Sequence, residues 1–444
     1  MRNAMYSVMK KEYPVVERAE GMYVYDTQGN KYLDCASGIA VTNIGYGVKE
    51  VIEAMYEQAK KVTFVYGGVF TSEAKEELAS RIIDMAPLGM EKVFFCSGGS
   101  EAMEAVVKIA RQYHLECNNT SKHKVISRWQ SYHGNTMMTL AIGGRPSWRK
   151  DYGPYFPQTS HVAQCNCYRC PFGLEYGSCD IVCAKDLERT INYEGADTVA
   201  AFVLEPIIGT TASATAPPKE YMREIRRICD KYNVLLCFDE VITGFGRTGK
   251  NFATDHFDIV PDIIGFAKGL GCGYTPIGGA IVNRKIVNAM LNGSGQNTMI
   301  YTFAGTPLSC ATANATLKYM NDNKLIENSE RMGKVFVEEL KVLETLECVG
   351  EVRGIGLMLG IELVRDKKTK EPFLAEERIS GKVAEYCFKK GLIITGGVPG
   401  SADGQKGEAL QIAPPFIITK EQISFAVGIL KEAIETVYNE VKKG

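Results

Sequence analysis

Two charged residues stand where buried strands are expected to end, and both suit chemistry on a carbonyl compound. Asp239 follows the apolar run Val234–Phe238, and Lys268 follows the apolar run Ile263–Ala267. Burying an unpaired charge costs several kcal/mol, so each side chain requires a partner. A lysine in that setting can have a lowered pKa and act as an amine nucleophile toward a carbonyl carbon. The alternatives are a helix N-cap for Asp239 and a solvated loop residue for Lys268.

A third group of residues is suited to binding an anion. The segment Cys96–Glu101 reads Cys-Ser-Gly-Gly-Ser-Glu and comes directly before a segment of helical periodicity. Small residues with free backbone N–H groups at a helix N-terminus form a site for a phosphate. The alternative is an ordinary serine N-cap, with Glu104 near the first turn. Together, the three features fit one ligand that carries a phosphate, a cationic ring nitrogen and an aldehyde.

The pattern between Glu91 and Val282 predicts a framework that brings these residues together. Short apolar runs alternate there with segments of helical period, such as Ser100–Tyr113 and Glu220–Tyr232. This alternation is typical of an α/β fold with a mostly parallel, doubly wound sheet covered on both faces. Ligands bind such sheets beyond the carboxyl ends of the strands. The expected strands are Val93–Cys96, Lys124–Ser127, Val199–Leu204, Val234–Phe238, Ile263–Ala267 and Ile277–Val282.

The two ends of the chain predict a smaller α+β domain built from both. Residues Gly21–Leu33 are expected to form a hairpin around Asp26–Gly29, followed by a helix from about Val48. We predict that residues 1–60 and 326–444 form the small domain and that residues 61–325 form the large one. The expected C-terminal elements are helices over Asn328–Glu344 and Glu376–Lys390 and from Glu421, strands over Ile355–Leu363, Gly391–Thr395 and Leu410–Ile412, and a loop over residues 396–408.

Composition and charge narrow the class of partner. The chain has 444 residues, and its 51 basic and 52 acidic side chains give a net charge of −1. Proteins that bind nucleic acid or anionic membranes normally have an excess of basic residues. No apolar run approaches the roughly 18 residues of a membrane span, and the N-terminus lacks a hydrophobic signal core. We therefore expect a cytoplasmic protein with a small-molecule partner and neither a nucleic-acid nor a membrane partner. In that compartment most of the 14 cysteines are expected to be free thiols.

Several sequence motifs, in a characteristic order along the chain, indicate a resemblance to a known family. The chain resembles the class III, or ω-amino-acid, branch of the pyridoxal-phosphate aminotransferases, which have the fold-type-I architecture. The resemblance runs from the Gly-Met-Tyr-Val-Tyr-Asp stretch at Gly21 to the Pro-Pro-Phe-Ile-Ile stretch at Pro414. Its diagnostic stretches are Phe95–Ala102, Ser131–Gly134, Glu205–Pro206, Phe238–Gly249, Phe266–Leu270 and Tyr301–Gly305.

The resemblance implies a cofactor, pyridoxal 5'-phosphate, and roles for individual residues. Lys268 would bind the cofactor covalently and move a proton between substrate and cofactor, and Asp239 would keep the ring nitrogen protonated, so these two are the implied catalytic residues. Ile39 and Gln411 would line the substrate pocket. The implied cofactor-binding residues are Gly99, Ser100, Tyr132, His133, Asp239, Val241, Lys268 and, on the phosphate of a neighbouring subunit, Thr302. The implied assembly is a homodimer or a dimer of dimers.

The chain departs from the family pattern at several positions. Relatives that use 2-oxoglutarate often bind substrate carboxylates with two arginines and carry a gating glutamate, and here Asn135, Gln411 and Thr210 stand in these places. Arg128, Arg145 and Lys406 are candidates for a substitute cation. Ile242 occupies the place of a glutamine that contacts the ring oxygen. Arg247, inside a diagnostic stretch, is expected to form a salt bridge.

A cysteine-rich insertion spans Cys165–Cys183. Its members Cys167, Cys170, Cys179 and Cys183 have spacings that suit a structural zinc or iron–sulfur site. Since the intervening segment is short and the family needs no metal, we expect free thiols and no metal.

The function that these observations predict is amino transfer from an ω-amino acid or amine to a small 2-keto acid, with pyruvate as the expected acceptor. One alternative is a 4-aminobutyrate or 5-aminovalerate type of aminotransferase that uses 2-oxoglutarate. Others are a racemase, an epimerase or a phospho-lyase with the same cofactor, and a catalytically silent regulatory protein centred on the cysteine insertion.

Overall fold

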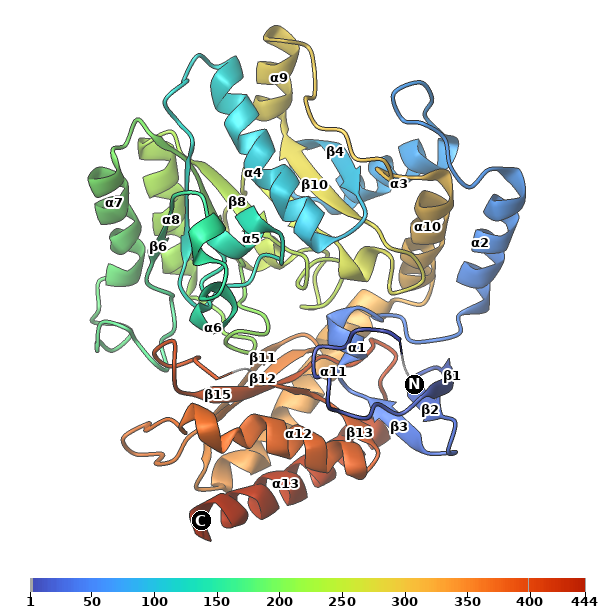
Figure 1. Ribbon diagram of the computed structural model, residues 1–444, viewed down its shortest axis with the longest axis vertical. Helices are drawn as coiled ribbons and strands as arrows, with labels where there is room; N and C mark the ends of the chain where they lie inside the picture. Colours follow the sequence, from blue (N-terminus) through green and yellow to red (C-terminus); the bar gives the residue numbers. More distant parts are fainter. Residues whose placement is uncertain (1–2, 398, 444) are drawn as a thin grey trace.

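The central feature of the structure, a computed structural model that describes residues 3–397 and 399–443, is a seven-stranded sheet (Figure 1). Its strands lie in the order β4-β10-β9-β8-β7-β5-β6. Strand β10 runs antiparallel to both of its neighbours, and the remaining pairs are parallel. The strands are β4 (Met90–Cys96), β5 (Lys124–Arg128), β6 (Thr159–Val162), β7 (Val199–Leu204), β8 (Leu235–Asp239), β9 (Ile263–Phe266) and β10 (Gly278–Asn283). The predicted α/β class is confirmed.

Helices cover both faces of this sheet, which explains why a central strand such as β7 is apolar throughout. In β7, Phe202 and Leu204 pack into a core formed with α7 (Val182–Glu194) and α8 (Lys219–Lys231). The alternate residues Ala201 and Val203 pack on the opposite face with α4 (Gly99–Glu116). Because successive side chains of a strand point to opposite faces, burial on both sides requires an unbroken apolar run.

All six expected strands of the large sheet are present, with ends shifted by a few residues. The sequence analysis missed β6, whose residues Thr-Ser-His-Val form no apolar run. Strand β6 lies at the edge of the sheet and is only partly buried, so it needs less apolar surface than the central strands.

Two smaller sheets lie below the large one in Figure 1. The first has the order β1-β2-β3-β13 and the second has the order β11-β12-β15-β14. The predicted hairpin after Gly21 is present as β2 and β3. The strands are β1 (Val16–Glu20), β2 (Tyr23–Asp26), β3 (Lys31–Asp34), β11 (Val349–Ile355), β12 (Met358–Leu363), β13 (Leu392–Ile393), β14 (Thr395–Gly396) and β15 (Glu408–Ile412).

Two of the expected C-terminal strands differ from the structure. The strand expected over Ile355–Leu363 is only β12, because Gly356 takes a positive φ of 55° and turns the chain back onto β11. The strand expected over Gly391–Thr395 divides into β13 and β14, which belong to different sheets. In the expected loop over 396–408, residue 398 lies outside the described residues, and Gly396 ends β14 while Glu408 begins β15.

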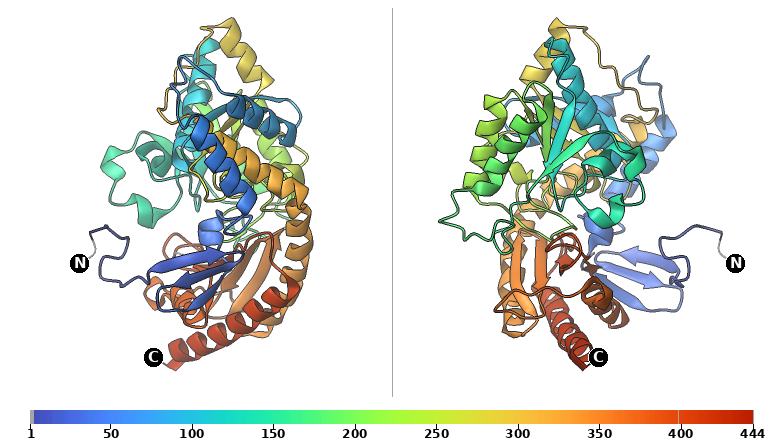
Figure 2. Two further views of the ribbon diagram at one scale, coloured as in Figure 1. Left: turned by 90° about the vertical axis from the view of Figure 1, so that its right-hand side faces the viewer. Right: turned by 60° about the vertical axis from the view of Figure 1, so that its left-hand side comes forward.

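The N-terminal and C-terminal parts of the chain lie side by side. Strand β13 pairs in parallel with β3, so that Leu392 lies opposite Leu33. Figure 2 shows the N-terminal strands next to the C-terminal helices. The further helices are α1 (Ser37–Ala40), α2 (Lys49–Lys61), α3 (Glu73–Met85), α5 (Met137–Ile142), α6 (Pro146–Arg149), α9 (Arg284–Asn292), α10 (Pro307–Asp322), α11 (Leu325–Leu340), α12 (Ile379–Lys389) and α13 (Lys420–Lys443). None of the helices in the described ranges is both long and apolar enough to cross a membrane.

Arg247 connects the parts of the chain that meet beneath the large sheet. Its fully buried guanidinium donates hydrogen bonds to the carbonyl oxygens of Leu357, at 3.0 Å, and Pro414, at 2.6 Å. It also donates to the Asn43 side-chain oxygen and, at 3.4 Å, to the Ser37 hydroxyl. Burial lowers the pKa of Arg247 to about 9. The expected salt bridge is wrong, because carbonyl, amide and hydroxyl oxygens accept these hydrogen bonds.

We predict that Arg247→Met destabilises the protein by about 3 kcal/mol, because it leaves several buried acceptors without a donor. For a chain of this length that corresponds to a fall of about 3 °C in the thermal unfolding midpoint. Arg284→Met is the matched control, since Arg284 is exposed and pairs with Glu91 on the surface. Equal midpoints for the two variants in a calorimetric comparison would contradict this role of Arg247.

Candidate active site

A cavity lies where the central strands of the large sheet end. It holds about 620 Å³ of space, including the part of its mouth that is open to solvent. Asp239 ends β8, Glu205 directly follows β7, and Lys268 follows β9 after one intervening residue. The residues that line the cavity are Gly99, Ser100, Tyr132, His133, Gly134, Glu205, Ile207, Asp239, Val241, Ile242, Thr243 and Lys268.

Lys268 presents a primary amine to this cavity. Burial lowers the pKa of Lys268 to about 8, although the negative charges of Asp239 and Glu205 oppose that shift. Its backbone has a φ of +32°, an uncommon value for a residue with a side chain. Within the described part of the chain, no hydrogen bond occupies the amine. A substantial fraction of Lys268 is therefore neutral and nucleophilic near pH 8.

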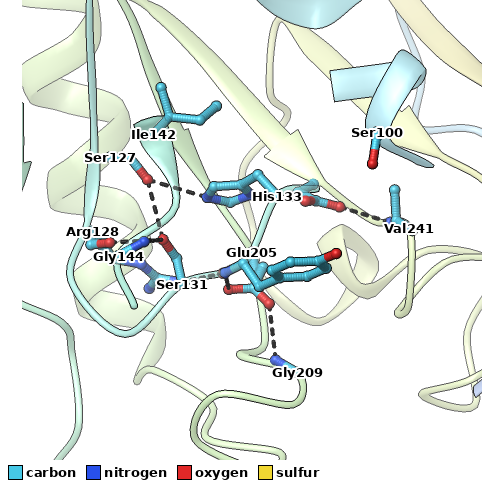
Figure 3. Close-up of polar contacts among 12 residues, drawn as sticks. Ser100, Ser127, Arg128, Ser131, His133, Ile142, Gly144, Glu205, Gly209 and Val241 are labelled. Carbon is cyan, nitrogen blue, oxygen red and sulfur yellow. Dashed lines mark hydrogen bonds and ion pairs between the residues drawn. The ribbon is translucent and has the colours of Figure 1, made fainter. Parts of the chain in front are cut away.

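Asp239 is held by hydrogen bonds on both carboxylate oxygens. His133 Nδ1 lies 2.8 Å from Oδ2, and the backbone N–H of Val241 donates to Oδ1 at 3.0 Å. The other ring nitrogen of His133 lies 3.1 Å from the Ser127 hydroxyl (Figure 3). With its proton on Nδ1, the imidazole donates to Asp239 and accepts from Ser127. Asp239 begins no helix, so the alternative of a helix N-cap is wrong.

Glu205 is a second buried carboxylate in the cavity wall. Its oxygens accept hydrogen bonds from the backbone N–H groups of Gly209, at 3.1 Å, and Tyr132, at 3.4 Å. Arg128 donates to the main-chain carbonyl of Glu205, so it does not neutralise the carboxylate directly (Figure 3). Burial is the main reason that the pKa of Glu205 rises to about 7.

The N-terminus of α4 forms another part of the cavity wall. Gly98 is its N-cap and no side chain caps the helix, so its first N–H groups are available to an anion. Ser100 does not act as the N-cap, and its hydroxyl instead accepts a hydrogen bond from the Asn135 N–H at 3.1 Å. A Cβ atom at Gly99 would come within 2.9 Å of the Val241 side chain, so only glycine allows this close packing.

These groups fit the cofactor that the family resemblance implies. A helix N-terminus suits a phosphate, a carboxylate suits a protonated ring nitrogen, and a partly neutral amine suits an aldehyde. All three groups line one cavity, where Tyr132 and Val241 supply apolar surface for a flat ring. The donor set is therefore compatible with pyridoxal phosphate.

The structure brings together most of the residues that the sequence analysis singled out. Gly99, Ser100, Tyr132, His133, Asp239, Val241 and Lys268 all line the cavity. Glu205 was given no predicted role, although it follows an apolar strand just as Asp239 does and could have been found by the same signal. The sequence also gives no sign of the hydrogen bond between His133 and Asp239, which are 106 residues apart.

Three predicted residues lie outside the lining of this cavity. Thr302 is exposed and lines a separate hollow with Tyr66 and Lys75. Ile39 is 48% exposed and belongs to α1. Gln411 is buried on β15, where its side-chain oxygen has no hydrogen-bond partner among the residues that the structure describes.

The cysteine-rich insertion runs from the end of β6 into the first turn of α7, outside the cavity. In the described ranges, no group of three or more His, Cys, Asp or Glu side chains is arranged so that it could hold a metal ion. All of the cysteines found there are free thiols.

Known proteins resemble this chain in both sequence and structure. The sequence matches the aminotransferase class-III family over residues 5–434. It is 38% identical over 436 residues to the uncharacterized aminotransferase YodT of Bacillus subtilis, a match that covers 98% of each chain. It is 34% identical over 424 residues to the putrescine–pyruvate aminotransferase of Pseudomonas aeruginosa, covering 95% of this chain and 90% of that one. The crystal structure of a Bacillus anthracis aminotransferase superposes with a TM-score of 0.90 at 38% identity, covering 98% of this chain and 96% of that one.

We predict that Glu205 gives the stability of the ligand-free protein a distinct pH dependence. Its carboxyl keeps its proton up to about pH 7 in the folded chain but loses it near pH 4.5 when unfolded. The stabilisation that this proton gives is therefore complete below pH 4.5 and is lost as the pH rises through about 7. Relative to Glu205→Gln, the parent should lose on the order of 3 kcal/mol of unfolding free energy across that interval.

Urea unfolding at a series of pH values measures this difference. The control is Glu220→Gln, because Glu220 is exposed and its pKa is lowered, so it should show no comparable change in the same interval. Parallel pH profiles for the parent and Glu205→Gln would refute the prediction.

Proposed function

Since this chain belongs to the class-III aminotransferases, we propose that it transfers the amino group of an ω-amino acid or amine to pyruvate, with pyridoxal 5'-phosphate as cofactor. The observation that carries this proposal is the convergence of Lys268, the His133–Asp239 pair and the N-terminus of α4 on one cavity. When bound, the cofactor supplies an electron sink for negative charge that develops on the substrate carbon.

Lys268 is the proposed catalytic base. Its amine would first hold the cofactor and then, once an amino substrate has displaced it, carry a proton between the substrate carbon and the cofactor carbon. A pKa of about 8 suits both tasks, because the neutral amine accepts a proton and the ammonium ion returns it.

Asp239 is the proposed partner of the cofactor ring nitrogen. A carboxylate there stabilises the protonated form of that nitrogen and so maintains the electron sink. His133 would act as a positioning residue, since its Nδ1 holds Oδ2 of Asp239 at 2.8 Å. The Ser127 hydroxyl, 3.1 Å from the opposite ring nitrogen, fixes the orientation of the imidazole.

The remaining contacts to the cofactor are assigned to residues around the ring and the phosphate. Gly99 and Ser100 would bind the phosphate at the start of α4. Tyr132 and Val241 would pack against the two ring faces. Tyr132 is supported by Trp148, whose ring meets it edge to face with 4.9 Å between centroids.

The side chains around the cavity favour a small acceptor. Among the described residues of the lining, Lys268 is the only lysine or arginine. A bidentate arginine–carboxylate contact contributes roughly 1.5–3 kcal/mol, so a doubly charged keto acid lacks that stabilisation here. Pyruvate has one carboxylate, so it loses less binding free energy than a doubly charged keto acid does. The relative from Pseudomonas aeruginosa, which is named for putrescine and pyruvate, supports the same choice.

The candidate substitute cations are engaged elsewhere or lie outside the lining. Arg128 donates to the Glu205 carbonyl, and Arg145 donates to the Pro399 carbonyl at 2.8 Å. The Arg145 guanidinium also lies 4.9 Å from the Trp148 ring centroid. Lys406 is exposed and is not part of the cavity wall.

A dimer is part of this proposal. Phe64, Ile300 and Phe303 are exposed by 41%, 77% and 62%, and Phe64 and Phe303 lie edge to face with ring centroids 6.0 Å apart. Exposed apolar side chains of this size suit a protein–protein interface. Thr302 lies between Ile300 and Phe303 in the sequence, so it would lie in the interface with a second copy that covers these side chains.

We predict that the enzyme with an amino donor alone releases about one equivalent of carbonyl product per chain and then stops until pyruvate is added. The donor's amino group stays on the enzyme until an acceptor removes it. Release measured by rapid quench should be more than about a hundredfold slower in Lys268→Ala, because general acid–base catalysis contributes roughly 10²–10⁴-fold. Lys285→Ala, a substitution on the surface of α9, is the control.

Two outcomes would reject transamination. Loss of stereochemical purity in the donor without release of a carbonyl product would indicate a racemase or an epimerase. Elimination of phosphate from a phosphorylated donor would indicate a lyase.

We predict that kcat/KM for pyruvate exceeds kcat/KM for 2-oxoglutarate with one competent donor. A missing contact of roughly 1.5–3 kcal/mol corresponds to a preference of about tenfold or more. A tenfold preference of the parent enzyme for 2-oxoglutarate would instead assign it to the 4-aminobutyrate or 5-aminovalerate type.

A further inference from the structure

A largely buried loop lies behind one wall of the active-site cavity. This 209–214 loop joins Ile208 to Thr215, whose backbones pair in an isolated antiparallel bridge. The backbone N–H of Gly209 donates to Oε1 of Glu205 at 3.1 Å (Figure 3). A Cβ atom at Gly209 would lie 2.7 Å from Cδ1 of Ile242. Because Glu205 and Ile242 both line the cavity, the loop packs directly against the back of its wall.

The backbone of this loop is strained. Ser213 and Ala214 have positive φ values of 38° and 60°, which lie in the region that favours glycine. Such conformations cost free energy and persist only where the surrounding structure holds them. The Thr211 hydroxyl holds one point of the loop, since it donates to the Gln130 carbonyl. The part around Ser213 is held by a different residue.

Arg353 of β11 binds the loop at two consecutive carbonyl groups. Its Nε donates to the Ser213 carbonyl at 2.8 Å, and its Nη2 donates to the Ala212 carbonyl at 2.9 Å. The same guanidinium forms ion pairs with Glu351 at 2.7 Å and with the buried Glu362 at 2.8 Å. The fixed plane of the guanidinium therefore connects the loop to two carboxylates of the β11–β12 hairpin.

Strand β12 lies against the loop as well. A Cβ atom at Gly360 would come within 2.0 Å of the Ser213 carbonyl oxygen, so a larger residue there would displace the loop. The 209–214 loop is thus enclosed between the hairpin on one side and the cavity wall on the other. A change in the contact between the hairpin and the loop therefore changes the support of Glu205 and Ile242.

The cysteine-rich insertion binds the same hairpin. Nε of Arg169, within the insertion, pairs with the second carboxylate oxygen of Glu362 at 2.7 Å. The neighbouring Tyr168 packs on β11, where a Cβ atom at Gly350 would come within 2.1 Å of the Tyr168 hydroxyl oxygen. Glu362 therefore connects the insertion to Arg353, and Arg353 connects the hairpin to the loop.

We propose that Arg353 is a positioning residue that sets the width of the substrate pocket by holding the 209–214 loop against Glu205 and Ile242, and that Arg169 supports it through Glu362. This inference rests on the proposed function, because it takes the occupant of the pocket to be an amino donor. Ile207 and Ile242 are apolar residues of the lining next to this loop, so their positions decide which carbon chains fit. Release of the loop lets this wall recede and admits a donor that is branched beside its amino group.

Amide hydrogen exchange of the holoenzyme without substrate tests the contact between Arg353 and the loop. Arg353→Lys keeps the charge beside Glu362 but loses the planar set of donors. Exchange in residues 205–216 should be faster by about tenfold or more, as expected when charge-assisted hydrogen bonds are lost. Exchange in β7 should not change. Arg169→Met should act in the same direction by a smaller factor, since Glu362 then keeps Arg353 as its partner.

The matched control is Arg365→Met. Arg365 follows β12, and its half-exposed side chain pairs with Glu377. This variant should exchange like the parent in both segments. Unchanged exchange of the loop in Arg353→Lys, or equally faster exchange in the loop and in β7, would overturn the positioning role. Unchanged exchange of the loop in Arg169→Met would overturn the supporting role of the insertion.

A pair of donors tests the width of the pocket. We compare kcat/KM for a linear primary amine with kcat/KM for the amine that carries a methyl branch beside its amino group. The ratio of branched to linear donor should rise about threefold or more in Arg353→Lys and stay constant in Arg365→Met. An equal fall for both donors would indicate a merely structural role and overturn the proposal.

The outcome for the proposed function is read separately. If the parent released no carbonyl product from either amine, the proposed transamination would fail. The ratio of the two amines' dissociation constants, measured from the absorbance of the bound cofactor, would then replace the ratio of kcat/KM values. A ratio that is the same in the parent and in Arg353→Lys would overturn the inference about the pocket.

Discussion

The site depends on the mutual compensation of charges at the carboxyl ends of three neighbouring parallel strands. Asp239 and Lys268, beside β8 and β9, are costly to bury alone, and each lowers the electrostatic cost of the other. His133 supplies the hydrogen bond that fixes one Asp239 oxygen. If the register of these strands changed by one residue, the charges would move into the apolar core or away from the cavity. The register of the strands and the positions of the charged groups in the site therefore depend on each other.

The buried arginines are likewise stabilised by several partners each. Arg247 donates to main-chain carbonyls of segments that meet beneath the large sheet, and Arg353 and Arg169 share Glu362 on β12. Each guanidinium offers five donors in a fixed plane, so one side chain can satisfy acceptors from several segments. The elements around the cavity are thus joined by specific hydrogen bonds as well as by apolar packing.

The groups that fit the cofactor and the residues in which this chain departs from the family pattern lie in different parts of the structure. The groups that fit the cofactor arise from strand ends and a helix N-terminus, which the rigid sheet positions. The residues that distinguish this chain, such as Gln411 and Ile242, lie on other elements and can vary without disturbing the sheet. The cysteine-rich insertion also lies outside the cavity, since it connects β6 with the first turn of α7.

The sequence by itself determined the class of fold, the central strands and most of the residues that meet in the cavity. Strands buried on two faces must be apolar throughout, so they can be recognised in the sequence. A charged residue that ends such a strand, as Asp239 ends β8, can be recognised for the same reason. The tertiary structure alone decided which distant residues touch. The His133–Asp239 hydrogen bond and the carbonyl partners of Arg247 each join residues far apart in the chain. The tertiary structure also decided the presence of β6 and the division of β13 from β14. An edge strand or a two-residue strand is defined by the strand that it pairs with, so its own residues show no periodic pattern.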